Sequence, residues 1–348
     1  MRALVAMSGG VDSSVAAALM RERGHEVVGV TLKLWSGPGG EAPTAGCCTV
    51  SDAEDARRVA GQLEIPYYVL EYTGRFDSGV VDRFVADYSR GRTPNPCVEC
   101  NRTVKFDALL GSLDDLGCDF LVTGHHARVS RNDGVFTLRR GADRDKDQSY
   151  VLSMLTQGQL ARLGFPIGEL NKDQVRAVAA EMGLRTASKP ESMEICFVGR
   201  GDYRDFLRKR APGAFTPGPL LDADGTHLGD HEGIAGFTIG QRRGLGVALG
   251  EPRYVVEIDP KTSSVIVGTK DRLGVSQVEL GQVSWVLDPV EGELVAQYRA
   301  HGDPVPATLE GSTLRFQSPQ EAVAPGQTVA FYEGDRVLGG AVIASTRR

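Results

Sequence analysis

The chain has 348 residues, of which 41% are hydrophobic, and a formal net charge of −6 at pH 7. This composition excludes a disordered chain, and at about 100–200 residues per domain it predicts two or three folded domains. A net acidic chain cannot coat nucleic acid through bulk positive charge, and we do not expect DNA as a partner. The start MRALVAMSGG is too short for a secretory signal, and no apolar run is long enough to cross a bilayer. We therefore expect a cytoplasmic protein with no membrane partner.

The first 200 residues alternate between strand and helix patterns. The runs predicted as strands are 3–7, 26–35, 67–72 and 119–126. A helix is expected at 12–23, and a second helix opens at Ser51, which forms a capping box with Glu54. Because these strands are apolar throughout, they indicate an α/β fold with a doubly wound, mostly parallel sheet. Such folds bind ligands at the carboxyl ends of their strands, where SGGVDSS and TGHHA stand.

The pattern changes after about residue 201. Short alternating runs such as RYVVEI, SVIVG and TVAFY are separated by turn sequences such as DADG and EGD. They predict two small all-β modules, the last of them a β-barrel. We place the domains at 1–202, 203–277 and 278–348.

The stretch MSGGVDSS (residues 7–14, here called the phosphate loop) lies between a predicted strand and a predicted helix. Gly9 and Gly10 permit a tight turn that directs successive backbone N–H groups at one point, and the dipole of the following helix favours an anion there. The hydroxyls of Ser8, Ser13 and Ser14 add donors. The loop has no lysine at the Walker position, which excludes a kinase-type P-loop. The plain alternative is a glycine-rich connection in which Asp12 only caps the helix.

The string S-G-G-x-D-S resembles the PP-loop of the N-type ATP pyrophosphatases. The resemblance implies an adenine nucleotide α-hydrolase-like domain that cleaves ATP between its α and β phosphates. It also implies that an oxygen of the second substrate is adenylated, and that Asp12 helps to hold Mg²⁺.

Along most of its length the chain resembles the bacterial tRNA-specific 2-thiouridylases, which replace the C2 oxygen of the wobble uridine with sulfur. The matching strings, in chain order, are SGGVDSSVAA, TPNPC..CN..VKF, TGHHA, KDQSYVL, ES.EICFVG...Y..FL, GF..GQRRGLG and VAPGQ. The resemblance implies an ATP-dependent sulfurtransferase with a catalytic domain at 1–202 and two tRNA-binding β modules after it.

The same resemblance assigns roles residue by residue. Cys196 would carry a persulfide received from a sulfur-donor protein, and Cys100 would be its partner and close a transient disulfide with it. The residues implied to bind ATP are Ala6, Met7, Ser8, Gly9, Gly10, Val11, Asp12, Ser13, Leu32 and Gly124. The residues implied to contact tRNA are Asn95, Pro96, Cys97, His125, Lys146, Asp147, Gln148, Tyr298, Arg299 and Gln327. The first three of these would border the flipped-out base.

The residues themselves, apart from the resemblance, also indicate roles for the cysteines. Six cysteines in a reducing compartment are not expected to form a disulfide framework. The run 101–110 looks helical, which would place Cys100 near a helix N-terminus beside Arg102 and Lys105, where the pKa of a thiol falls. A buried, inert cysteine is the alternative. Cys118 is expected in the core, and Cys47 and Cys48 receive no role.

Cys97 departs from the family, many of whose members carry an aspartate there. A thiol cannot take over a carboxylate's proton transfer, because the reference pKa values are roughly 8.5 and 3.9. Together, Cys97, Cys100 and Cys196 resemble the three ligands of an iron–sulfur cluster in other tRNA thiolases, which makes a cluster-dependent thiolase the alternative. A zinc site completed by His125 or His126 comes after it. More distant alternatives are an amide-forming ligase on a small carboxylate, which would leave the thiols idle, and a nucleotide-sensing RNA-binding protein.

Overall fold

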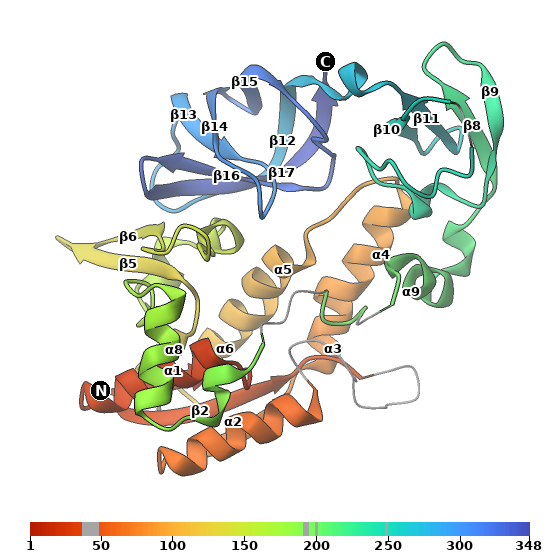
Figure 1. The fold of residues 1–348 in the computed structure, drawn as a ribbon. Coiled ribbons are helices and arrows are strands. Elements are labelled where there is room, and N and C mark those ends of the chain that lie inside the picture. The colour runs from red at the N-terminus through yellow and green to blue at the C-terminus, as the bar shows by residue number, and fades with distance from the viewer. Residues whose placement is uncertain (37–48, 191–194, 199–200, 248–249) are drawn as a thin grey trace.

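A five-stranded parallel sheet forms the centre of the N-terminal half (Figure 1). The computed structural model describes residues 1–36, 49–190, 195–198, 201–247 and 250–348. The strands, in spatial order, are β3 (Tyr67–Glu71), β2 (Glu26–Lys33), β1 (Arg2–Ala6), β4 (Phe120–Thr123) and β7 (Leu163–Gly164). Every neighbouring pair is parallel. The predicted parallel sheet is therefore confirmed.

Helices cover both faces of the central strands β1, β2 and β4, which are apolar on both sides. The edge strand β3, which we also predicted as buried, is largely exposed. Along β1, Ala3 and Val5 pack into one buried cluster and Leu4 into another. The first cluster includes residues of α1 (Val11–Glu22), α2 (Val50–Gln62) and α8 (Lys172–Glu181). The second includes residues of α3 (Thr73–Phe76), α4 (Asp82–Ser89), α5 (Pro96–Glu99) and α6 (Asp107–Gly111). Two further helices are α7 (Gln157–Leu160) and α9 (Tyr203–Arg210). Among the described residues, none of the helices is long and apolar enough to span a membrane.

The N-cap of α2 is Thr49, two residues earlier than the predicted cap Ser51. The hydroxyl of Thr49 accepts a hydrogen bond from the Asp52 backbone N–H (3.1 Å), and the Asp52 carboxylate accepts one from the Thr49 N–H (3.2 Å). This is the capping box of the helix, and the predicted box of Ser51 and Glu54 is wrong. Glu54 instead pairs with Arg58 on the exposed surface.

The helix that carries the C-x-x-C pair also begins earlier than predicted. The Asn95 side chain accepts from the backbone N–H groups of Cys97 (3.1 Å) and Val98 (3.3 Å), and Pro96 occupies the first turn. The helix continues through a π-helical segment, Cys100–Phe106, into α6. The run 101–110 is helical as predicted, but its helix begins at Pro96, so Cys97 lies in the first turn and Cys100, predicted near the N-terminus, follows one turn later.

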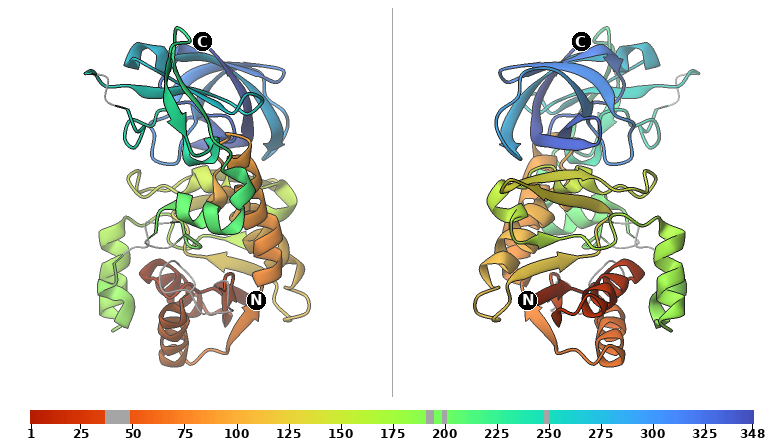
Figure 2. Two further views of the ribbon diagram at one scale, coloured as in Figure 1. Left: turned by 90° about the vertical axis from the view of Figure 1, so that its right-hand side faces the viewer. Right: turned by 90° about the vertical axis from the view of Figure 1, so that its left-hand side faces the viewer.

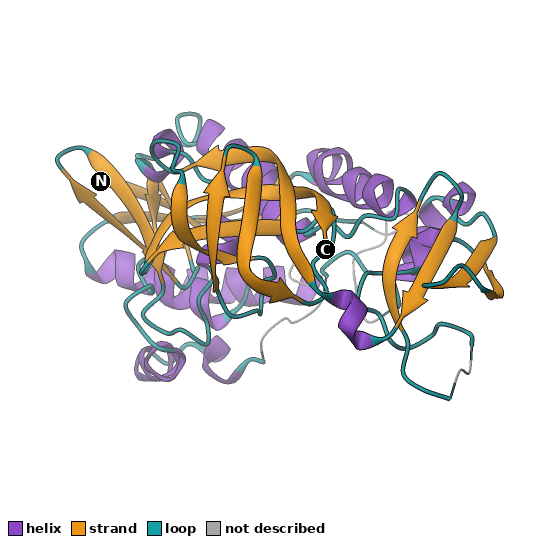
Figure 3. Ribbon diagram, turned by 90° about the horizontal axis from the view of Figure 1, so that it is seen from above, coloured by secondary structure: helices purple, strands orange, loops and turns teal. Residues whose placement is uncertain are grey.

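The C-terminal half contains two β modules, as predicted (Figure 3). One is a four-stranded sheet in the order β10 (Tyr254–Asp259), β11 (Ser264–Gly268), β8 (Gly218–Asp222) and β9 (His227–His231). The other is a closed antiparallel barrel of β12 (Val275–Trp285), β15 (Thr313–Gln320), β14 (Val305–Glu310), β13 (Gly292–Gln297), β16 (Thr328–Glu333) and β17 (Arg336–Arg347). The pairing of β12 with β17 closes it. The domain boundaries after residues 202 and 277 stay predictions.

A hairpin from the N-terminal half extends the barrel sheet. It consists of β5 (Ala127–Asn132) and β6 (Val135–Arg140), and Arg139 of β6 pairs with Arg336 of β17. The Asp335 carboxylate accepts hydrogen bonds from Arg128 (2.7 Å) and Arg139 (2.5 Å) of the hairpin. The barrel therefore rests directly on the N-terminal half, as the side views in Figure 2 show. The sequence did not predict this contact.

Candidate active site

The phosphate loop lies where the ends of β1 and β4 meet, at the point where the strand order of the sheet reverses. Gly9 has φ of +72°, and a Cβ there would lie 2.2 Å from the backbone oxygen of Asp52. A Cβ on Gly124, just after β4, would lie 2.5 Å from the backbone nitrogen of Ser13. Only glycine allows the start of α2 and the turn after β4 to approach the loop this closely.

The serines of the loop hold its turn closed. The Ser13 hydroxyl accepts from the Ser8 N–H (3.1 Å) and donates to the Gly10 carbonyl (3.2 Å), and the Ser14 hydroxyl donates to the same carbonyl (2.8 Å). Gly10 is the N-cap of α1 and has no side chain to accept from the first amides of this twelve-residue helix. An anion can therefore accept hydrogen bonds from these amides.

A pocket of about 210 Å³ opens on one side of the loop, and we call it the apolar pocket. It is lined by Ala6, Met7, Ser8, Gly10, Asp12, Ser13, Val30, Thr31, Leu32, Leu34, Lys105, Thr123, Gly124, His125 and Gln148. Eight of the ten residues predicted to bind ATP are in this lining. The exceptions are Gly9, which lies against Asp52, and Val11, which faces the pocket described next.

A second pocket, the lysine pocket, opens on the other side of the loop. It is lined by Ser8, Gly10, Val11, Asp12, Asp52, His126, Lys146, Gln148, Lys172, Lys189 and Pro190. The two pockets share Ser8, Gly10, Asp12 and Gln148. The loop therefore separates a mainly apolar space from one that three ammonium groups surround.

Asp12 is the carboxylate of the loop. Its two oxygens accept hydrogen bonds from Lys172 Nζ at 2.8 and 2.9 Å, and His126 Nε2 lies 3.3 Å from Oδ1. Burial raises the pKa of the Asp12 carboxyl, but the hydrogen bonds from His126 and Lys172 outweigh it and hold the pKa below its ordinary value. Asp12 is therefore ionised at neutral pH, as a ligand of Mg²⁺ must be. Mg²⁺ takes one or two carboxylates together with substrate phosphates, which one aspartate beside an anion-binding loop fits.

The described residues contain no group of three or more His, Cys, Asp or Glu side chains that could hold a metal ion. The three-thiol cluster and the zinc site therefore gain no support from the part of the chain that the structure describes.

His125, which we predicted to contact tRNA, lines the apolar pocket. It is buried, and its Nδ1 lies 2.7 Å from the Thr123 hydroxyl. Burial, together with the nearby charge of Lys105, lowers the pKa of His125 to about 3. The imidazole is neutral at physiological pH and cannot pair with a phosphate as a cation.

The predicted trio at 146–148 divides between two roles. Lys146 and Gln148 line the lysine pocket, and the Gln148 side chain accepts from the His126 N–H (2.9 Å). Asp147 points inward and accepts from the backbone N–H groups of Gly141 and Ser149, both at 3.0 Å. Asp147 therefore shapes the turn that presents its two neighbours.

The residues predicted to contact tRNA in the barrel also differ in exposure. The Tyr298 ring is buried in the barrel core, and the exposed Arg299 lies over it at 5.2 Å. Gln327 lies beside a contact with the N-terminal half, in which the Thr93 N–H donates to the Pro325 carbonyl (2.8 Å). The turn that holds Gln327 therefore adjoins the segment that leads into Asn95, Pro96 and Cys97.

The predicted catalytic thiols lie around one apolar cluster. Cys100 is a buried member of it, and the half-buried Cys196 packs against it. Phe197 packs its ring against Phe84 (5.1 Å) and Trp35 (6.3 Å), and Trp35 follows Leu34 of the apolar pocket. Cys97 is exposed. Cys118 is buried, which confirms its predicted place in the core. Cys47 and Cys48 lie outside the described residues.

Several residues of the site escaped the sequence analysis. Buried Glu99, inside the C-x-x-C segment, accepts from Arg83 (3.1 Å) and Arg102 (2.7 Å). Arg102 is therefore tied to a carboxylate, and Lys105 reaches the apolar pocket instead. Lys172 and Lys189 lie far from the phosphate loop in sequence, and no motif marks them. For Asp52, the partner of Lys189, the sequence did hold a signal, because Thr49 and Asp52 have the spacing of a capping box.

Comparisons with known proteins agree along the whole chain. Family models match residues 1–200 (tRNA methyl transferase HUP domain), 204–269 (tRNA methyl transferase PRC-barrel domain) and 275–343 (Aminomethyltransferase beta-barrel domain). The tRNA-specific 2-thiouridylase MnmA of Roseiflexus castenholzii is 47% identical, over 98% of this chain and 98% of its own. The protein of the same name from Carboxydothermus hydrogenoformans is 49% identical, over 98% and 97%.

A solved structure, the U34-tRNA thiolase NcsA from Methanococcus maripaludis, is similar at a TM-score of 0.38 and 18% identity. The match covers 62% of this chain and 68% of that one. This likeness is too distant to bear on function. The two close relatives and the family models decide the assignment, and they show that the chain belongs to the tRNA-specific 2-thiouridylase family.

Proposed function

We propose that this protein is an ATP-dependent tRNA 2-thiouridylase that replaces O2 of the wobble uridine with sulfur. The observation that carries the proposal is the phosphate loop between its two pockets, with the thiol-bearing helix reaching the apolar one through Lys105. This arrangement can bring a nucleotide, a base and a sulfur nucleophile to one place. The proposed catalytic domain spans 1–202, and the modules at 203–277 and 278–348 bind tRNA.

The first step activates the uridine. Adenosine would occupy the apolar pocket, beside Leu32 and Gly124, with its phosphates on the amides of the phosphate loop. O2 of the uridine attacks the α phosphorus, and diphosphate leaves. Mg²⁺, held in part by Asp12, would supply charge that neutralises the phosphates. The conversion is needed because an amide-like carbonyl oxygen is a poor leaving group until it is bonded to phosphorus.

The second step delivers sulfur. A donor protein would load Cys196 as a persulfide, whose terminal sulfur attacks C2 and expels AMP. The Cys100 thiolate then attacks Sγ of Cys196. That step breaks the sulfur–sulfur bond to the base, releases the 2-thiouridine and leaves a Cys100–Cys196 disulfide for cellular thiols to reduce.

The base must leave the anticodon stack, because C2 is hidden within it. We infer that Asn95, Pro96 and Cys97 border the extruded base, and that Arg299 and Gln327 contact the RNA from the barrel. Arg299 is exposed, and Gln327 adjoins the segment that leads to Asn95, which supports a continuous RNA path. Lys146 and Gln148, which line the lysine pocket, would contact the nucleotide in addition to the tRNA.

The test is reconstitution. Purified protein is mixed with unmodified tRNA, ATP and a persulfide donor, and the digested nucleosides are identified by mass spectrometry while AMP and diphosphate are measured. We expect 2-thiouridine to form with AMP. Stimulation of ATP cleavage by a small carboxylate without tRNA, or methylated rather than thiolated uridine, would refute the proposal.

Cys97 separates the persulfide and cluster schemes. With Cys97→Asp, activity should survive if sulfur travels as a persulfide, because the carboxylate restores the residue common in the family. It should be lost if Cys97 ligates a cluster. Broad visible absorbance of the anaerobically purified protein would favour the cluster scheme.

A further inference from the structure

We propose that Lys172 and Lys189, with Lys146, bind the diphosphate half of the nucleotide, and that each of the first two exchanges a carboxylate partner for phosphate. This inference rests on the proposed function and deepens it by assigning the lysine pocket. The three side chains come from separate segments of the chain and line one pocket beside Ser8 and Gly10.

Lys172, the first residue of α8, contacts the phosphate loop directly. Its ammonium lies 2.8 and 2.9 Å from the two oxygens of Asp12, and its side chain is only 12% exposed. Asp12 is also the carboxylate expected to hold Mg²⁺. A metal ion at Asp12 would compete with the ammonium for the same two oxygens, so that Lys172 would turn toward the phosphates.

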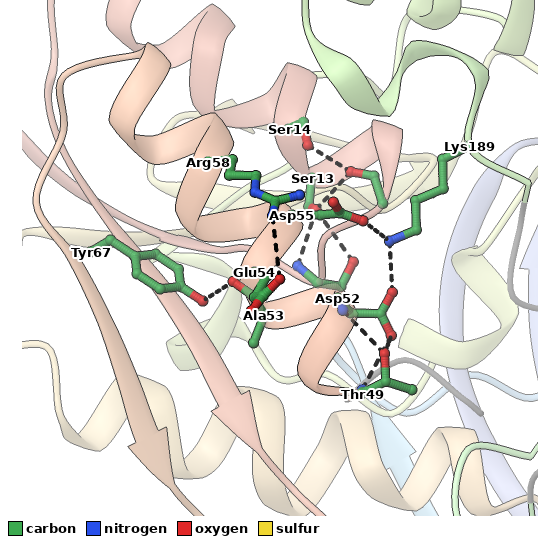
Figure 4. A network of polar contacts seen from close by, with 12 residues as sticks. Ser13, Ser14, Thr49, Asp52, Ala53, Glu54, Asp55, Arg58, Tyr67 and Lys189 are labelled. Atoms are coloured by element: carbon green, nitrogen blue, oxygen red, sulfur yellow. Dashed lines mark hydrogen bonds and ion pairs between the residues drawn. The ribbon is translucent and has the colours of Figure 1, made fainter. Parts of the chain in front are cut away.

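Lys189 pairs with carboxylates of α2, as Lys172 pairs with the carboxylate of Asp12 in α1. Its ammonium lies 2.7 Å from Asp52 and 2.6 Å from Asp55, as Figure 4 shows. Burial lowers the pKa of Lys189, but the hydrogen bonds to Asp52 and Asp55 outweigh it and raise the pKa above its ordinary value. The side chain is therefore a full cation. Asp52 also lies against Gly9 of the phosphate loop, so the pair is held beside the loop.

The donors that line the pocket suit an anion. Lys146, Lys172 and Lys189 line it together with the carboxylates of Asp12 and Asp52, and Asp55 also pairs with Lys189, so Lys172 and Lys189 would bind phosphate in exchange for these carboxylates. The first amides of α1 point to the same place. A polyanion in the pocket could therefore accept hydrogen bonds from amides and ammonium groups together.

The experiment measures binding of inorganic pyrophosphate with Mg²⁺, and separately of AMP, by titration calorimetry. We expect Lys172→Met and Lys189→Met each to weaken pyrophosphate binding by about 10-fold or more. A 10-fold loss corresponds to the weaker end of the contribution that one hydrogen bond to a charged group makes to binding. AMP binding should change less than about 2-fold, because adenosine occupies the apolar pocket. Lys172→Arg and Lys189→Arg should recover most of the pyrophosphate affinity.

The matched control is Lys270→Met, which removes an exposed lysine paired with Glu321 and should leave both affinities unchanged. Unchanged pyrophosphate affinity in both methionine variants would overturn the proposal. So would an equal loss of AMP and pyrophosphate binding, which would indicate a collapsed loop. If tRNA binding weakens while pyrophosphate binding does not, the pocket holds an RNA phosphate and the proposal is wrong.

The outcome is independent of sulfur transfer. Loss of pyrophosphate binding in these variants would support the inference even if the wild-type protein made no 2-thiouridine, because neither tRNA nor a sulfur donor takes part. Conversely, thiolation by a protein whose lysine variants bind pyrophosphate normally would support the proposed function and refute this inference.

Discussion

Replacing Gly9 with alanine should damage the phosphate loop more than the fold. The left-handed backbone at φ of +72° costs a residue with a Cβ about 1–2 kcal/mol. The new methyl would also lie 2.2 Å from the backbone oxygen of Asp52, so the loop and the start of α2 must separate. Overpacking of this kind costs about 1–3 kcal/mol. Together the two effects amount to about 2–5 kcal/mol, below the stability of a typical domain.

The assay compares ATP affinity, by calorimetry, with thermal unfolding. We expect Gly9→Ala to stay folded at 25 °C with a lowered Tm and to lose ATP binding by at least about 10-fold, because the amides that face the phosphates are displaced. The matched control is Gly61→Ala in α2, where a Cβ meets nothing within 4 Å. It should gain about 0.4–1 kcal/mol and bind ATP normally. Wild-type ATP affinity in Gly9→Ala would refute the reasoning.

Three further predictions concern the thiols, the buried histidine and the barrel contact. Cys100→Ser and Cys196→Ser should each abolish 2-thiouridine formation, measured by mass spectrometry, and keep ATP binding, whereas Cys118→Ala should remain active; activity in either serine variant removes that cysteine from the mechanism. The pKa of His125 is lowered to about 3 in the folded state, below its ordinary 6.5. As the pH drops, the unfolded chain therefore takes up the proton first. The free energy of unfolding should fall between about pH 6.5 and pH 3, by up to about 1.4 kcal/mol per pH unit. In urea titrations His125→Gln should show a smaller loss over this range, and an identical slope would contradict the assignment. Asp335→Asn breaks two partly exposed ion pairs to the β5–β6 hairpin, worth about 1 kcal/mol, and should speed hydrogen exchange in β6 and β17; unchanged exchange there would show that the ion pairs do not hold the barrel.

Local signals in the sequence predicted much of the fold. Apolar runs without alternation predicted buried parallel strands, because both faces of such a sheet are covered. The glycines of the phosphate loop predicted a tight turn, because few other residues adopt its backbone angles. Helix starts were less secure. Both Thr49 and Ser51 have a carboxylate three residues later, and tertiary contacts decided between them: Asp52 is buried and pairs with Lys189, whereas Glu54 is exposed and pairs with Arg58.

What the sequence by itself determined is the chemistry available: a phosphate loop, a C-x-x-C pair, a distant cysteine and the order of strands and helices. Only the tertiary structure decided which of these groups share a space. It brought Lys172 and Lys189 to the loop, made His125 neutral by burying it, and joined the barrel to the β5–β6 hairpin. The physical reason is that burial, charge pairing and close approach depend on residues far apart in the chain, whereas turns, caps and periodicity depend on near neighbours.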